Sequence, residues 1–317
     1  MNGVINVYKE PGYTSHDVVA KLRGILKMKK IGHTGTLDPQ AEGVLPVCLG
    51  NATKLCDMLT DKTKEYEAVM QLGVTTDTQD MTGTILSEHK VDVTEEYISD
   101  IMSTFTGKIE QIPPMYSALK VNGKKLYELA REGKEVERRA RSVEIYELQI
   151  LEITLPLVRF RVSCSKGTYI RTLCQDIGEK AGCGACMKSL KRTRVDRFLA
   201  ENALTLSEIE NLRDMGRIGE VLVAVEDMFE DYPKITVSNA YRKAIDNGNR
   251  IEDKMIINRT SDISAAKKTD EKQRGRIRVY NEDGVFYGIY EHAEGHGYKP
   301  YKMFLDRELL QRQEDSL

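Results

Sequence analysis

The sequence predicts a mixed α+β fold, with a largely antiparallel central sheet, flanking helices and a small β-barrel-like module at the carboxyl end. Segments with the two-residue period of strands outnumber those with a helical period, and the two kinds rarely alternate one to one, as they would in a parallel sheet. The composition also shifts near Asp231-Tyr232-Pro233. Because 317 residues suffice for both parts, we expect domains at residues 1–230 and 231–317.

The amino-terminal part predicts a strand, a helix, a loop and a second strand. Val4–Tyr8 alternates weakly between apolar and polar residues and runs into a Pro-Gly turn. Ser15 is a suitable N-cap, because apolar residues recur on one helical face beyond it. A glycine-rich loop follows. The apolar run Val44–Leu49 then predicts a buried strand, and Ala52–Leu59 predicts a short helix.

Strands and helices are mixed between residues 64 and 213. In KEYEAVMQLG, residues Tyr66, Ala68, Met70 and Leu72 alternate with the other set, which predicts a strand with one buried face. The expected strands are KEYEAVMQLG, Val143–Ile153, Val158–Cys164 and Leu190–Val195, and the expected helices are Thr94–Phe105, Tyr169–Lys180 and Leu206–Arg213.

Two later regions differ from this pattern. Ile112–Arg141 is rich in turns and positive charge, which predicts a long, partly helical excursion from the sheet; such loops are usually functional or mobile. In the carboxyl-terminal module we expect a helix at Asn239–Asp246, a charged loop at Ser261–Arg276, and a hairpin. Its strands are Ile277–Tyr280 and Val285–Tyr290, joined by an Asn-Glu-Asp-Gly turn.

Composition excludes several classes of protein. No run approaches the ~18 apolar residues of a membrane span, and the amino terminus lacks the pattern of a secretory signal. Six cysteines in a chain of this size suit reduced thiols, so we expect a cytoplasmic protein with no membrane contact. Cys183 and Cys186 form a CxxC pair without the second pair of a zinc ribbon, which favours small buried thiols.

The charge of the chain gives a mixed signal. The net charge is -2 and the pI is about 6.3, whereas nucleic-acid-binding domains usually have a pI above ~9. Basic residues nevertheless gather in three clusters along the chain, and such clusters, together with a glycine-rich segment, are a moderate sign of RNA or phosphate binding. The clusters are Lys27, Lys29 and Lys30, then Arg138, Arg139 and Arg141, then Lys188, Lys191, Arg192, Arg194 and Arg197.

The loop GHTGTLDPQAEG at residues 32–43 is the main candidate for chemistry. It lacks GxGxxG and the GK[ST] ending of a phosphate loop, and its three possible ligands match no metal motif. A plain connecting turn remains an alternative. Pro39 biases Asp38 to an extended backbone and the glycines allow close approach of another chain, which favours a reactive or orienting carboxylate. Glycoside hydrolysis would require a second carboxylate, and spacing identifies none.

Four other residues carry weaker signals when taken alone. Tyr66 is typical of a half-buried strand, Tyr169 of helix packing, Arg171 of a surface ion pair and His33 of a turn. From spacing, the structural interpretation of each is more frequent than the functional one.

Taken together, these segments resemble the TruB-type tRNA pseudouridine-55 synthases. GHTGTLDPQAEGVLPVCLGNATKL resembles the catalytic motif of that family, and KEPGYTSHDVV, KEYEAVMQLGVTTDTQDMTG, QIPPMYSALKVNGKKLYELAREG and GTYIRTLCQDIG resemble its other motifs. They span roughly residues 3–197. The carboxyl-terminal module is similar to a PUA domain, although the charged stretch at residues 261–276 departs from compact versions. The implied fold is the mixed sheet of the pseudouridine synthases.

The resemblance implies isomerisation of one uridine in the T-loop of tRNA. The base is detached from its ribose, turned and rejoined through C5, with no cofactor and no metal. Asp38 is then the essential carboxylate, Arg171 its partner, and Tyr66 stacks on the target base and serves as, or assists, the base for the last proton. Whether Asp38 attacks the sugar or removes a sugar proton stays open.

The resemblance also implies a binding surface for the flipped nucleotide and the RNA arm. His33, Tyr169 and Leu190 would line the nucleotide site, with Lys9 in a supporting role. The mobile segment at residues 112–141 would grip the RNA, ordering when it binds. The expected phosphate contacts are Lys29, Lys30, Arg138, Arg139, Arg141, Lys191 and Arg192.

Alternatives from three classes remain open. They are an RNA-binding or tRNA-folding protein without turnover, a pseudouridine synthase acting on another RNA, and a glycosidase. An intact set of Asp38, Tyr66 and Arg171 disfavours the first, and the missing second carboxylate disfavours the last. We expect a monomer that acts on the tRNA T-arm without a protein partner.

Overall fold

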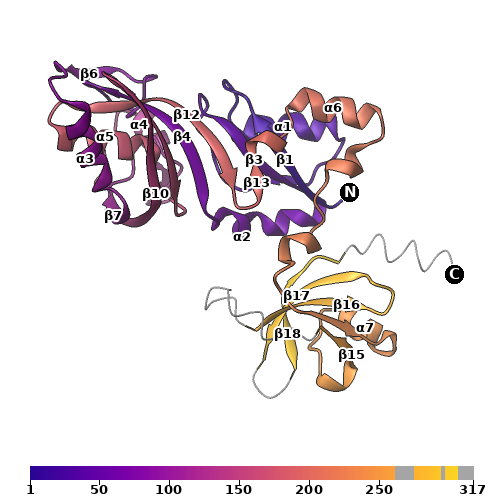
Figure 1. Cartoon of the computed structure of the whole chain (residues 1–317). Coiled ribbons are helices and arrows are strands. Elements are labelled where there is room, and N and C mark those ends of the chain that lie inside the picture. Colours follow the sequence, from indigo (N-terminus) through magenta and orange to yellow (C-terminus); the bar gives the residue numbers. More distant parts are fainter. Residues whose placement is uncertain (261–274, 294–296, 306–317) are drawn as a thin grey trace.

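A nine-stranded sheet forms the body of the protein (Figure 1). The computed structural model describes residues 1–260, 275–293 and 297–305. Seven strands follow the order β1-β3-β12-β4-β11-β10-β7, while β2 pairs with β3 and β13 with β12. The strands are β1 (Gly3–Lys9), β2 (Ile31–His33), β3 (Glu42–Leu49), β4 (Lys64–Leu72), β7 (Gly107–Gln111), β10 (Arg141–Thr154), β11 (Leu157–Cys164), β12 (Ala185–Val195) and β13 (Phe198–Leu199).

The sheet is largely antiparallel, as predicted. Within its described strands, the pairing of β3 with β12 is parallel and the other pairings are antiparallel. The alternation expected in β4 is confirmed, because Tyr66, Ala68, Met70 and Leu72 are buried. Two small hairpins lie outside the sheet: β5 (Val74–Thr76) with β6 (Ile85–Glu88), and β8 (Lys120–Val121) with β9 (Lys124–Lys125).

Helices cover the sheet at both of its ends. At one end α3 (Glu95–Ser103) and α5 (Ile170–Ala181) pack over an apolar cluster that includes Tyr66 and Phe160. At the other end α1 (Ser15–Ile25) and α6 (Leu206–Asp214) enclose a second cluster. None of the helices within the described residues is long and apolar enough to cross a membrane.

Several predicted helices shift at their ends. The N-cap of α1 is Thr14 rather than Ser15: the Thr14 side chain accepts from the Asp17 N–H, and the Asp17 carboxylate accepts from the Thr14 N–H. Ser15 instead lies inside the first turn, buried against the glycine-rich loop. The predicted helix Ala52–Leu59 is divided between a 3-10 turn (Gly50–Leu55) and α2 (Cys56–Thr60). The segment at residues 112–141 contains α4 (Leu126–Arg131).

A separate five-stranded sheet follows in the carboxyl-terminal part (Figure 1). It contains β14 (Lys234–Val237), β15 (Ile256–Arg259), β16 (Arg276–Asn281), β17 (Phe286–His292) and β18 (Tyr298–Met303), with α7 (Arg242–Asp246) beside it. The predicted hairpin is confirmed as β16 and β17. The predicted helix Asn239–Asp246 begins as a 3-10 turn. Of the charged stretch, residues 261–274 lie outside the described residues.

This second sheet packs directly on the first. Ile289 and Phe304 share an apolar cluster with Val4, Val44 and Phe229 of the larger part. The Lys54 ammonium also donates to the Met303 carbonyl at 2.6 Å. The two parts therefore share a buried apolar contact as well as a chain connection.

The packing of α5 against β12 predicts a clear difference between two glycine substitutions. A Cβ at Gly178 would lie 2.2 Å from the Ala185 nitrogen, whereas nothing lies within 4 Å of a Cβ at Gly24 in α1. Gly178→Ala should lower the free energy of unfolding by about 1–3 kcal/mol through overpacking. The matched control Gly24→Ala should raise it by roughly 0.5–1 kcal/mol through helix propensity. Urea denaturation measures both, and equal unfolding midpoints would contradict this packing.

Candidate active site

Asp38 lies in the loop between β2 and β3, and buried side chains hold the backbone on both sides of it. The Ser15 hydroxyl accepts from the Leu37 N–H at 2.9 Å. The Lys9 ammonium donates to the carbonyls of Pro39 at 3.0 Å and Ala41 at 2.6 Å. Lys9 is 0% exposed and these bonds hold the loop, while the supporting role expected for it in nucleotide binding stays a prediction.

One rung of the large sheet passes directly beneath this loop. Lys9 on β1 pairs with Gly43 on β3, Gly43 with Arg192 on β12, and Arg192 with Tyr66 on β4. Because rung partners project to the same face of a sheet, the three side chains meet on one side. Gly43 has φ +105°, and a Cβ there would lie 2.2 Å from the Arg192 carbonyl oxygen, so glycine is required at this crossing.

Arg192 is buried under the loop rather than presented to solvent. It is 1% exposed, and its Nε donates to the Val44 carbonyl at 2.7 Å. Its Nη1 and Nη2 lie 3.4 Å and 3.5 Å from the carbonyls of Thr36 and Gly35. The structure therefore places the guanidinium among protein carbonyls under the loop and not on the exposed groove where an RNA-backbone contact was expected. The alternation of β12 already indicated this burial, because Arg192 lies two residues after buried Leu190 and therefore on the same face.

Arg171, on the first turn of α5, forms a two-point ion pair with Asp38. Its Nε lies 3.0 Å from Oδ2 and its Nη2 3.1 Å from Oδ1. This bidentate geometry orients a carboxylate as well as stabilising it. The Arg171 side chain is buried, whereas the Asp38 side chain remains 33% exposed. Burial raises the pKa of Asp38 above its ordinary value, and the Arg171 charge opposes that rise.

Asp80 is a site residue that sequence reasoning missed. Its Oδ2 lies 3.8 Å from Arg171 Nη1 and the side chain is 13% exposed. Its other oxygen accepts from the hydroxyls of Thr78 and Thr82 and from the Thr82 N–H. Asp80 is 42 residues from Asp38 in the chain, and the turn-like TQDMTG context gave no sign of their proximity.

Tyr66 lies at the centre of the assembly. It is 7% exposed and shares an apolar cluster with Leu37 and Leu190. Arg192 is its partner on the neighbouring strand β12, so the Arg192 charge acts on its hydroxyl. Burial raises the pKa of Tyr66, Arg192 opposes that rise, and Asp38 adds to it. The structure thus brings together Asp38, Arg171, Tyr66 and Leu190.

His33 and Tyr169 lie at the ends of the elements that enter the site. His33 ends β2, half-buried, with its ring 5.1 Å from that of His16. Burial lowers the pKa of His33, which favours the neutral ring at neutral pH. Tyr169 precedes α5, where its N–H donates to the Gln111 side chain at 3.0 Å and its carbonyl accepts from the same amide at 3.2 Å.

The remaining predicted phosphate contacts come from three parts of the fold. Lys29 and Lys30 are exposed in the connection from α1 to β2, and Arg139 and Arg141 are exposed at the start of β10. Arg138 is half-buried and its Nη1 donates to the Pro113 carbonyl at 3.1 Å. Lys191 on β12 lies over the Tyr8 ring, at 5.6 Å from its centroid.

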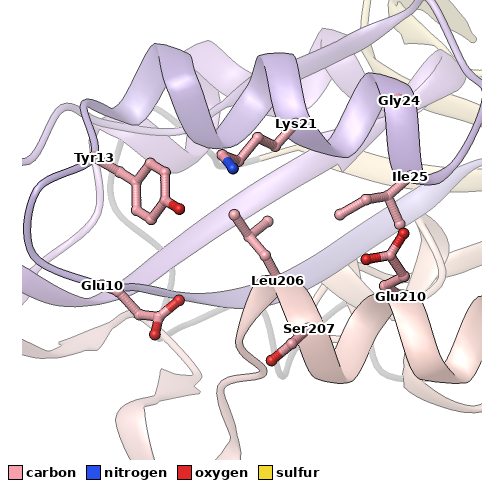
Figure 2. A pocket seen from close by; sticks show the side chains of 8 residues that line it. All are labelled: Glu10, Tyr13, Lys21, Gly24, Ile25, Leu206, Ser207 and Glu210. Carbon is pink, nitrogen blue, oxygen red and sulfur yellow. The ribbon is translucent and has the colours of Figure 1, made fainter.

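Two other features lie apart from this assembly. A cavity of about 450 Å³ between α1 and α6 is lined by Tyr13, Lys21 and Glu210 among others, and by none of the predicted site residues (Figure 2). All six cysteines are free, and Cys183 and Cys186 are buried, as predicted. Across the described parts of the chain, no group of three His, Cys, Asp or Glu side chains could hold a metal ion.

In chemical terms, the site offers one accessible carboxylate beside a buried aromatic ring. Asp38 is aimed by Arg171 and carried on a braced loop, while Asp80 is already occupied by its own hydrogen bonds. Such a site suits attack on, or proton removal from, a sugar whose base can be held near Tyr66.

Comparison with known proteins matches most of the chain to one family. Residues 23–170 match the TruB family pseudouridylate synthase N-terminal domain, and residues 171–230 match the tRNA pseudouridylate synthase B C-terminal domain. The chain is 54% identical to tRNA pseudouridine synthase B of Lachnoclostridium phytofermentans, over 96% of this chain and 100% of that protein. It is 46% identical to the protein of that name from Clostridium novyi, over 91% and 95%.

Solved structures agree with these relatives. A chain of an H/ACA RNP bound to a substrate RNA containing 2′-deoxyuridine is 28% identical, with a TM-score of 0.70 over 96% of this chain and 86% of that one. A chain of a Cbf5-Nop10-Gar1 complex is 30% identical, with the same TM-score and coverage. The matched domains, the full-length relatives and the shared fold together show that this chain belongs to the TruB family of pseudouridylate synthases.

Proposed function

We propose that this protein converts the uridine at position 55, in the T-loop of tRNA, to pseudouridine. The observation that carries the proposal is the single accessible carboxylate, Asp38, paired with buried Arg171. Full-length relatives named tRNA pseudouridine synthase B support the reaction and the substrate.

In the proposed reaction, the target nucleotide first leaves its stack. Extruding it costs a few kcal/mol, and stacking on an aromatic ring returns roughly 1–3 kcal/mol. Tyr66 would receive the base, while neutral His33, Tyr169 and Leu190 line the nucleotide site. Asp38 then either attacks the sugar carbon or removes a sugar proton, and the glycosidic bond to N1 breaks.

The detached base turns and rejoins the sugar through C5. The C5–H bond then breaks, its electrons restore the ring double bond, and Tyr66 accepts or relays the proton. Because one proton leaves C5 and another joins N1, the reaction is an isomerisation that needs no hydrolytic water and no cofactor. Arg171 would keep Asp38 ionised and aimed throughout.

The proposal assigns a role to each part of the chain. Residues 1–230 form the catalytic domain, and residues 231–317 form a PUA-like domain that binds RNA. The separate sheet that begins at Lys234 supports this division. Within the catalytic domain, residues 112–141 grip the RNA. Arg171 Nη2 donates to the Tyr116 carbonyl at 2.9 Å, so this segment is linked to the catalytic pair.

The proposed setting is a monomer acting on the tRNA T-arm in the bacterial cytoplasm. The two relatives quoted above are named tRNA pseudouridine synthase B, whereas the similar Cbf5 chain belongs to a complex with Nop10 and Gar1. Activity of the lone protein on tRNA distinguishes these settings. The alternatives are a synthase acting on another RNA and an RNA-binding protein without turnover.

The role of Asp38 is tested with a tRNA transcript tritiated at uridine C5. Wild-type protein should release tritium, with the product mapped to the T-loop. Asp38→Asn should reduce release by roughly 10²–10⁴-fold or more, because the amide can neither attack nor accept a proton. Asp61→Asn, at an exposed ion pair with Lys166, is the matched control and should leave release unchanged. Tight tRNA binding by a wild-type protein that releases nothing would favour the alternative without turnover.

The Asp38–Arg171 pair predicts a pH dependence. Asp38 acts as the ionised form, so activity is lost as pH falls through its pKa, and burial places that pKa above the ordinary ~3.9. Arg171→Met removes the charge that opposes the rise and should move the acid limb of the single-turnover rate to higher pH. Arg171→Lys should retain part of the wild-type position. An acid limb at the same pH in Arg171→Met and wild type would contradict the pairing.

RNA binding should be strongly salt-dependent. Exposed Arg139 and Lys29 are proposed phosphate contacts, so Arg139→Ala should weaken tRNA binding and reduce the slope of log K against log salt by about one. Lys90→Ala, where the ammonium lies 3.3 Å from Asp92, is the control. Filter binding between ~50 and ~200 mM salt measures both. An affinity that does not change with salt would contradict phosphate contact.

A further inference from the structure

Arg192 is a buried cation that has no role in the proposed reaction as described above. Among the described residues it is the largest side chain that is fully buried. Within the described part of the chain, its hydrogen-bond partners are the carbonyls of Val44, Thr36 and Gly35, and its strand partner on β4 is Tyr66. A buried charge whose acceptors are all neutral costs free energy of folding. Replacing buried charged groups by apolar side chains is often neutral or stabilising. A specific use for the charge is therefore to be expected.

The strand register shows what the guanidinium connects. Arg192 faces Tyr66 directly across β12 and β4, and its backbone crosses Gly43 on β3. From this rung the side chain reaches Gly35 and Thr36, three and two residues before Asp38. The guanidinium therefore lies between the loop of the proposed carboxylate and Tyr66, the proposed base. With 1% exposure it is shielded from solvent.

The groups around Tyr66 determine how easily its hydroxyl loses a proton. Burial raises the pKa of Tyr66 most strongly; Arg192 on β12 opposes that rise by stabilising negative charge on the oxygen, and Asp38 in the loop adds to it. Cys164 on β11 also faces the ring, and burial raises the pKa of its thiol to about 11, so it is neutral at neutral pH. Among these neighbours, Arg192 supplies the positive charge that a phenolate oxygen would need.

Resting on the proposed function, we propose that Arg192 is a positioning residue for the last step, the removal of the C5 proton. Its charge, facing Tyr66 across the rung, offsets part of the cost that burial places on the phenolate, which is the form in which Tyr66 accepts that proton. The C5–H electrons restore the C5–C6 double bond, and Tyr66 becomes a neutral phenol that later returns its proton to water. The proton on N1 of the product comes from water.

The test compares deuterium isotope effects at C5. Arg192→Gln removes the charge, so the single-turnover rate should fall roughly 10–100-fold, as for loss of a hydrogen bond to a charged group. Because the last step then limits the rate, tRNA deuterated at uridine C5 should show a larger isotope effect than with wild type. The affinity for tRNA should stay within about twofold. Should Arg192→Gln fail to fold, Arg192→Lys, which keeps a buried charge but loses the planar fork, carries the same test.

Lys9→Met is the matched control. Lys9 is the other buried cation of this rung, and it holds the carbonyls of Pro39 and Ala41 but does not reach Tyr66. Its loss should lower the rate by disturbing Asp38, without increasing the C5 isotope effect. In addition, 3-fluorotyrosine at position 66, a more acidic phenol, should restore part of the rate of Arg192→Gln.

Two results would overturn the inference without touching the proposed function. One is a slow Arg192 variant whose C5 isotope effect equals that of wild type, since that marks a purely structural role. The other is an equal increase of the isotope effect in Lys9→Met. Failure of the proposed function is distinct, because wild type itself would then release no tritium from C5.

Discussion

The site depends on buried cations that satisfy the backbone carbonyls of an irregular loop. A loop packed over a sheet leaves carbonyls without strand partners, and such groups are costly when buried. Lys9 and Arg192 supply the donors, and the same carbonyls are the acceptors that these buried charges require. Burial lowers the pKa of Lys9 to about 8, so the carbonyls compensate its charge only in part. Gly43 lies between the two on the rung and leaves room for the β12 backbone at Arg192.

This support explains how Asp38 can be both fixed and accessible. Its neighbours Leu37 and Pro39 are held by Ser15 and Lys9, so the carboxylate can project from the surface without losing its aim. Arg171 approaches from the other side of the site. The Arg171 guanidinium also donates to the carbonyls of Thr78 and Tyr116, which come from the hairpin beyond β4 and from the segment at residues 112–141. A shift of either segment on RNA binding would therefore reach the catalytic pair.

Strand parity and motif spacing predicted most of the fold, because β4, β10, β11 and the β16–β17 hairpin are local patterns. The Asp38–Arg171 pair followed from resemblance rather than from spacing, since 133 residues separate the two. Arg192 was expected at the RNA backbone because of its charge, and Lys9 in a supporting role because of its motif, yet both share a strand face with buried neighbours. Parity shows that they point inward, but only the tertiary structure shows that they meet one loop. Ser15 was displaced from the cap position by its contact with Leu37.

The same arrangement explains why the carboxylates of this site favour isomerisation over hydrolysis. A glycosidase needs two working carboxylates about 5–10 Å apart, one of them to protonate a leaving group or activate water. Here Asp80 lies near Arg171 but accepts three hydrogen bonds from Thr78 and Thr82, while Asp38 alone faces outward. In the proposed mechanism, the base is detached beside Asp38 while Asp80 is held in its own hydrogen bonds, so this pair offers no second free carboxylate for hydrolysis. The base would instead rejoin the sugar through another atom, which is the proposed isomerisation.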